Sequence, residues 1–116
     1  MENVVAGKSF AFAKRIVRLC RFLRQSRDEY VITKQLLRSG TSIGANVAEA
    51  KYAQSRPDFV SKLSIALKEA GETDYWLRLL HETNYLTEEQ FMSVKRDCEE
   101  LVKLLAAIVK TAKEHS

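Results

Sequence analysis

The most regular stretch of the sequence lies near its end, where residues 87–112 read TEEQFMSVKRDCEELVKLLAAIVKTA. Apolar side chains recur there at alternating steps of three and four residues, the spacing that places them on one face of an α-helix. Those positions are Phe91, Val94, Cys98, Leu101, Leu105, Ile108 and Ala112. Thr87 and Gln90 have the spacing of a capping box, in which each side chain hydrogen-bonds the other's backbone. The pattern predicts a helix over 88–113 with one face buried in a bundle.

Three further helices are predicted before this one. Apolar stripes and breaking residues place them at 8–24, 30–54 and 57–83. Pro57 is tolerated in a first helical turn, and Asn84 can take the left-handed conformation that ends a helix. The connections are short, so consecutive helices run antiparallel. The sequence therefore predicts an all-α fold, an antiparallel up-and-down four-helix bundle with long helices, as a single domain over 1–116.

The composition agrees with a helical protein. Of 116 residues, 46% are hydrophobic and 29% are charged, and the chain has only four Gly and one Pro, too few turn residues for an all-β fold. The most apolar window, 101–109, is far shorter than the roughly 20 residues that span a bilayer, and residues 1–10 lack the pattern of a signal peptide. Cys20 and Cys98 lie far apart without metal-ligand neighbours. We therefore expect a cytoplasmic protein without a membrane segment, and two cysteines packed in its core.

The second predicted helix contains two glycines one turn apart, Gly40 and Gly44, within SGTSIGAN at residues 39–46. An internal glycine costs a helix about 1 kcal/mol relative to alanine, so another interaction has to compensate for it. One interpretation is that the glycines allow the backbone to pack closely against another helix. The alternative is a break or turn at Gly40.

Basic residues gather in the first half of the chain. Residues 1–56 hold 11 Lys and Arg against 4 Asp and Glu, a net charge of +7, and 57–116 hold 8 against 11, or −3, which together give +4. The candidate nucleic-acid-binding residues on or just after the first helix are Lys14, Arg15, Arg18, Arg21, Arg24 and Arg27. Lys14, Arg18 and Arg21 follow steps of four and three, so they share a face that can bind phosphates of RNA or DNA. The alternative is a solvated face that pairs with acids of the last helix, such as Asp97, Glu99 and Glu100.

A second polar set lies on the two middle helices. Glu69 and Glu72 are three residues apart beside Trp76, and carboxylates among apolar neighbours require a cation from Arg38, Lys68 or another subunit. One interpretation is a subunit interface or structural polar cluster with Trp76 as its anchor. Its members are Arg38, Asn46, Glu49, Glu69, Glu72 and Trp76. The alternative is a solvated rim of the third helix.

The spacing of the histidines does not favour catalysis. The chain has no Glu-x-x-His pair of the kind that builds di-iron bundles, and no His-x-x-x-His spacing for a transition metal. His81 and Glu82 are adjacent, so on a helix their side chains point about 100° apart. We expect a protein without catalytic residues, metal or cofactor, in which His81 lies at the end of a helix.

Several segments resemble a known bacterial family. They are Arg38–Ala50 (RSGTSIGANVAEA), Asp58-Phe59, Lys62–Ala66 (KLSIA), Lys68–Ala70 (KEA), Glu72-Thr73 and Tyr75–Leu77 (YWL). In these segments the chain resembles the bacterial four helix bundle protein family, also called the 23S ribosomal RNA intervening-sequence protein family, over nearly its whole length. The resemblance implies a bundle that assembles into a barrel-shaped homopentamer, a helix that continues through Gly40 and Gly44, and no catalytic residues.

The resemblance also suggests which molecules the protein binds. A related branch, the accessory variability protein of diversity-generating retroelements, binds nucleic acid and a reverse transcriptase. The family motif includes Asn46, Glu49, Glu69 and Glu72, which the resemblance implies are structural or interface positions. The leading hypothesis is therefore a non-enzymatic oligomer that binds RNA or DNA through its first helix. The alternative is a ring that serves as a scaffold for a protein partner, for example a reverse transcriptase, without direct binding of nucleic acid.

Overall fold

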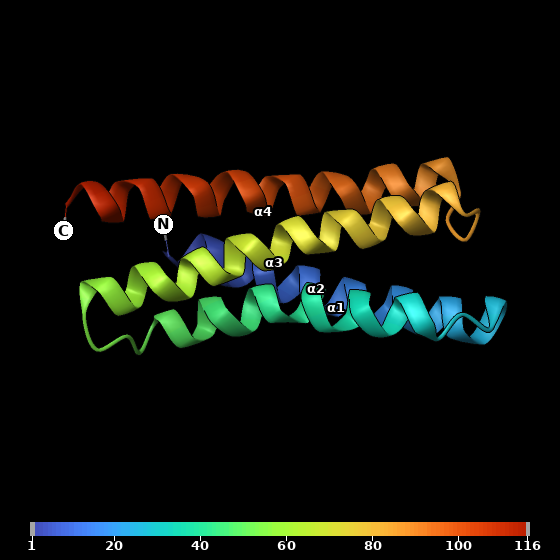
Figure 1. Cartoon of the computed structure of the whole chain (residues 1–116), viewed down its shortest axis with the longest axis horizontal. Coiled ribbons are helices and arrows are strands. Elements are labelled where there is room, and N and C mark those ends of the chain that lie inside the picture. The colour runs from blue at the N-terminus through green and yellow to red at the C-terminus, as the bar shows by residue number, and fades with distance from the viewer. Residues whose placement is uncertain (1, 116) are drawn as a thin grey trace.

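The chain folds into four long helices joined by short connections. The computed structural model describes residues 2–115 and contains α1 (Glu2–Arg27), α2 (Val31–Ala50), α3 (Arg56–Glu82) and α4 (Glu88–Glu114). Between residues 2 and 115 no strand occurs. The helices run lengthwise beside one another in a body of 47 × 21 × 19 Å and alternate in direction (Figure 1). The predicted all-α, antiparallel four-helix bundle is confirmed.

The helix boundaries differ from the prediction by three residues or more at three places, one of which is the end of α1, at Arg27 rather than at residue 24. α1 begins at Glu2 rather than at residue 8, because Val5 and Ser9 are buried and extend its inward face toward the N-terminus. α2 ends at Ala50 rather than at residue 54, since the chain has to reverse before α3. Ser55 marks the end of that turn, and its side chain accepts the backbone N–H of Asp58 at 3.1 Å. A helix that continued to residue 54 would leave no room for the reversal.

The predicted helix ends around α4 are confirmed. Thr87 Oγ accepts the backbone N–H of Gln90 at 3.1 Å, and the Gln90 side chain accepts the backbone N–H of Thr87 at 2.9 Å. Asn84, in the turn after α3, has a φ of 69°, the left-handed conformation that asparagine tolerates. These contacts fix the turn that sets α4 antiparallel to α3.

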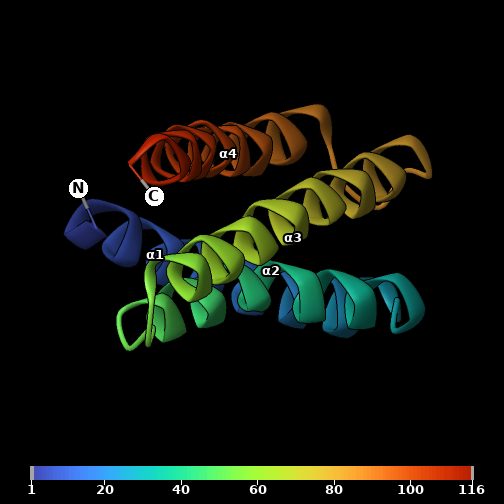
Figure 2. The same ribbon diagram turned by 60° about the vertical axis from the view of Figure 1, so that its left-hand side comes forward.

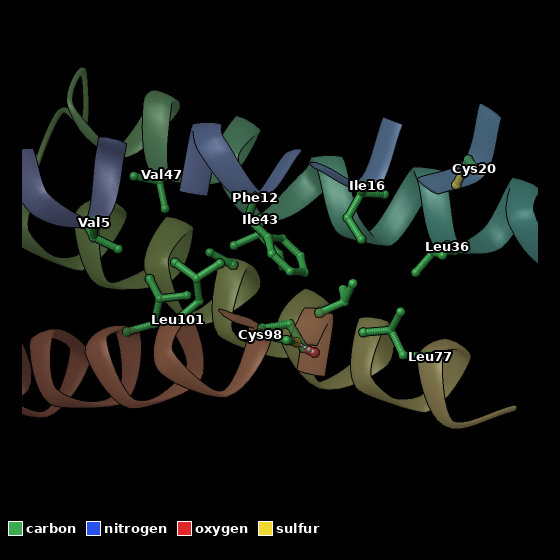
Figure 3. Close-up of a cluster of buried hydrophobic side chains, with 14 of the residues drawn as sticks. Val5, Phe12, Ile16, Cys20, Leu36, Ile43, Val47, Leu77, Cys98 and Leu101 are labelled. Carbon is green, nitrogen blue, oxygen red and sulfur yellow. Dashed lines mark hydrogen bonds between the residues drawn. The ribbon is translucent and has the colours of Figure 1, made fainter. Parts of the chain in front are cut away.

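α2 passes through Gly40 and Gly44 without a break, so the alternative of a turn at Gly40 is wrong. A Cβ atom at Gly40 would lie 2.9 Å from two side-chain carbons of Ile16, and one at Gly44 would lie 3.2 Å from the carbonyl oxygen of Ser9. Both glycines therefore face α1 at close range. Figure 3 shows Ile16 of α1 in the shared core, with Leu36 and Ile43 of α2 and Leu77 of α3.

The four helices do not pack equally closely. α1 with α2, α2 with α3, and α3 with α4 contact each other extensively, whereas α1 and α4 make far fewer contacts. In both views α3 lies between α4 and α2 (Figures 1 and 2). The outer side of α1, away from the core, is consequently covered by no other helix along much of its length.

Candidate nucleic-acid interface

Three of the six predicted basic residues point outward from α1. Lys14, Arg18 and Arg21 are all exposed. In the part of the chain that the structure describes, Arg18 and Arg21 have no hydrogen-bond or ion-pair partner, and the ammonium group of Lys14 lies 5.3 Å from the ring centre of Phe10. These three cations form the free basic stripe of α1.

The other three predicted cations are held by neighbouring elements of the bundle. Arg15 donates to the Asp97 carboxylate and to the Ser93 hydroxyl, both at 2.6 Å. Arg24 donates to Thr33 Oγ at 3.0 Å. Arg27 donates to a backbone carbonyl in the turn before α4 at 3.1 Å and lies over the Tyr85 ring. These residues join α1 to α4, α2 and the α3–α4 turn, so the expected pairing with α4 acids holds for Arg15 and not for the outer stripe.

Two exposed aromatic residues on α1 escaped the sequence analysis. Phe10 and Phe22 are 65% and 47% exposed, which is unusual for phenylalanine. Phe10 lies one turn before Lys14, and Phe22 one turn after Arg18. The sequence signal is the regular four-residue spacing of Phe10, Lys14, Arg18 and Phe22, with a phenylalanine at each end.

The predicted polar cluster is partly assembled across α2 and α3. Arg38 forms ion pairs with Glu69, at 3.2 Å, and with Glu72, and the Trp76 indole N–H donates to Glu72 at 2.9 Å. The cation that the acidic pair requires therefore comes from the same chain. Since the Glu69 side chain is only 14% exposed, this part of the cluster is not a fully solvated rim.

The remaining two members of that set lie apart from it. Glu49 pairs with Lys62 at 3.1 Å, farther along the α2–α3 boundary. The Asn46 side chain donates to the backbone carbonyl of Ser42 on its own helix at 2.9 Å. Four of the six residues thus form one connected group, and Asn46 and Glu49 lie outside it.

Cys20, Cys98 and His81 lie in structural surroundings. Cys20 and Cys98 are free and buried, and burial raises the pKa of their thiols to about 11 and about 12, so both are neutral at physiological pH. His81 lies 2.8 Å from Glu88 and stacks on Phe91, at the junction of α3 and α4. Among residues 2–115 no group of three His, Cys, Asp or Glu side chains could hold a metal ion. None of the described helices is long and apolar enough to cross a membrane.

Comparison with known proteins decides the family. A family model described as 23S rRNA-intervening sequence protein matches residues 1–107. The chain belongs to this family. It is also similar to a protein of unknown function from the S23 ribosomal protein family of Bacteroides thetaiotaomicron, whose crystal structure has a TM-score of 0.93. That similarity covers 94% of this chain and 97% of the other, with 58% sequence identity. No curated protein matches.

Membership of the 23S rRNA-intervening sequence protein family supports the fold and leaves the activity open. The similar solved protein is itself of unknown function, and no enzymatic family is indicated. A functional hypothesis for this family member has to be based on its own surfaces, which are the free basic stripe of α1 and the polar cluster of α2 and α3.

Proposed function

We propose that this member of the 23S rRNA-intervening sequence protein family is a non-enzymatic protein that binds RNA or DNA through the outer face of α1. The observation that supports the proposal is the free basic stripe, in which Arg18 and Arg21 have no anionic partner within residues 2–115. Neighbouring cations without counter-charges attract a polyanion, because binding releases the ions condensed on its phosphates. The two buried free thiols fit a reducing compartment such as the cytoplasm.

The stripe has the dimensions for contacts with the nucleic-acid backbone. From Lys14 to Arg21 the helix rises by roughly 10 Å, at about 1.5 Å per residue. Three cations over that length can contact neighbouring phosphates of one strand. The logarithm of the affinity is then expected to fall with the logarithm of the salt concentration with a slope of about −2 to −3. Such contacts position a nucleic acid without reading its sequence.

The double variant Arg18→Glu/Arg21→Glu is expected to lose at least about tenfold in affinity at low salt, because it replaces attraction to phosphates by repulsion. Filter binding of RNA and DNA across a salt series measures this. The matched control is Lys103→Glu/Lys110→Glu, which changes the net charge equally through exposed residues of α4. Absence of binding at low salt, or an equal loss in both double variants, would contradict a site on α1.

We further propose that the chain assembles as a homopentamer, the state that the family resemblance implies, through the α2–α3 surface around Arg38, Glu69, Glu72 and Trp76. Exposed apolar residues next to this cluster support the choice of surface, since Ile65 is 41% and Tyr75 50% exposed. An aromatic anchor beside a satisfied polar group is typical of protein interfaces.

Light scattering is expected to give five times the 13.3 kDa mass of one chain. Tyr75→Glu should shift the mass toward smaller species, because it places a charge among the apolar contacts. Tyr52→Glu, an equivalent change at the turn after α2, should leave the mass unchanged. A monomeric mass for the unaltered protein would exclude the pentamer, and an equal effect of both substitutions would exclude this surface.

The same exposed residues support a second candidate function, a scaffold for a protein partner such as a polymerase. In that case the charges serve assembly rather than nucleic-acid binding. A pull-down that recovers a partner after nuclease treatment, from a protein that binds no RNA or DNA in the filter assay, would favour the scaffold.

A further inference from the structure

The outer face of α1 carries an uninterrupted row of four side chains, one per turn. Phe10, Lys14, Arg18 and Phe22 follow each other at steps of four, so each is the surface neighbour of the next. All four are exposed, and the row spans roughly 18 Å at about 1.5 Å per residue. Arg21 lies beside this row and adds a third cation. The cations occupy the middle of the row and an aromatic ring stands at each end.

The two exposed rings are apolar surface that a binding partner can cover. Burying a phenylalanine fully is worth about 1.5–3 kcal/mol, and the bundle leaves 65% of Phe10 and 47% of Phe22 exposed. Their immediate neighbours in the row are cations rather than other apolar residues. A partner that fits this row must therefore offer flat apolar faces spaced along an anionic chain.

Single-stranded nucleic acid has this combination of groups. Its bases expose their faces, which stack on aromatic side chains, and its phosphates bind cations. A duplex hides the base faces inside its stack, so it could use the three cations but would leave Phe10 and Phe22 in water. The alternation of rings and cations thus favours an unpaired strand over a duplex.

The surroundings of Phe22 also favour the stacking of a base on its ring. Phe22 borders a hollow of about 350 Å³ that is also lined by Arg27, Tyr85 and Gln90. Arg27 lies over the Tyr85 ring at 5.0 Å, so a cation and a second aromatic residue stand beside Phe22. A base stacked on Phe22 would lie at the mouth of this hollow.

We infer that α1 binds single-stranded nucleic acid in preference to duplex, with one base stacked on Phe10, another on Phe22, and the intervening phosphates on Lys14, Arg18 and Arg21. This inference rests on the proposed function and specifies its ligand. Because stacking tolerates any base, we expect weak sequence preference.

The test measures fluorescence anisotropy with a labelled oligonucleotide that lacks self-complementarity, and with the duplex that it forms with its complement. Phe10→Leu/Phe22→Leu removes both rings and keeps apolar side chains of good helix propensity. We expect this variant to lose about 5- to 150-fold in affinity for the single strand per ring that stacks, and to bind the duplex as before. Phe10→Tyr/Phe22→Tyr should retain the affinity, and Tyr52→Leu, which removes an exposed ring outside the row, should not change it.

The possible outcomes separate this inference from the proposed function. Equal affinity for single strand and duplex, unchanged by the leucine pair, overturns the inference and leaves charge-based binding intact. An equal loss of affinity for single strand and duplex in the leucine pair would assign the rings to folding. A change in oligomeric mass without a change in single-strand affinity would assign them to subunit contact. Either result also overturns the inference. Failure to bind either ligand at low salt refutes the proposed function itself.

Discussion

Replacing Gly40 with leucine is expected to lower the free energy of unfolding by about 2–3 kcal/mol, although leucine is the better helix former. A Cβ at this position would lie 2.9 Å from both Cγ atoms of Ile16. Ile16 is fully buried and branched at its Cβ, so its side chain has few rotamers and a close-packed environment. The clash can be relieved only if α1 moves away from α2, which weakens the core that both helices share.

Urea unfolding followed by circular dichroism measures the effect, and the chain offers a matched control. Gly71 lies exposed within α3, and a Cβ there would meet no atom within 4 Å. Gly71→Leu is therefore expected to leave stability unchanged or to raise it by up to about 1 kcal/mol, from helix propensity alone. A destabilisation of equal size at both positions would show that the close approach at Gly40 has no energetic role.

A compensating substitution tests the contact itself. Ile16→Ala alone should cost about 2–5 kcal/mol, because it leaves a cavity between α1 and α2. In the double variant Ile16→Ala/Gly40→Leu the leucine can occupy that space. The stability losses of the two single variants should therefore add up to more than the loss of the double variant. The expected difference is about 1 kcal/mol or more. Simple additivity would mean that the two side chains do not compete for the same volume.

The buried faces of the helices were predictable because they depend on a local period. All seven apolar positions predicted for α4 are buried, because they lie on one face of the helix and that face packs against the other helices. Helix ends were less predictable. Val5 and Ser9 extend the buried face of α1 toward its N-terminus. Their burial depends on the helices that cover them, which the local sequence does not show. The end of α2 at Ala50 likewise reflects the space needed for the chain to turn.

The candidate interface was only partly predictable for a related reason. Spacing alone shows which cations share a face, and it groups Lys14, Arg18 and Arg21, which are all exposed on α1. It does not show which side chains of the other helices lie close to each cation. Arg15 differs from Arg18 by three residues, and Asp97 of α4 engages it while Arg18 remains free. The distinction between a structural arginine and an available one arises from tertiary packing.

Glu29 is the clearest case of a role that tertiary structure creates. Its residue type does not predict this role, because glutamate is not a favoured N-cap residue. In the structure it is buried, and its carboxylate accepts the backbone N–H groups of Val31, Ile32 and Thr33 at 3.2, 2.8 and 2.7 Å. Tyr30, at the cap position, makes no such side-chain bond. Glu29 therefore satisfies the free N–H groups at the start of α2 and places a negative charge at the positive end of its dipole.

Glu29→Ala is expected to lower the free energy of unfolding by about 2–3 kcal/mol, because three N–H groups in a partly buried turn lose a charged acceptor. Glu29→Gln, which retains an acceptor oxygen without the charge, should cost less. Glu89→Ala is the control, since Glu89 is exposed in the first turn of α4 and should contribute only about 0.5 kcal/mol through the dipole. Hydrogen exchange provides the local readout, with faster exchange at Ile32 and Thr33 in Glu29→Ala. If those amides stayed protected and stability fell no further than in Glu89→Ala, the carboxylate would not be what anchors the start of α2.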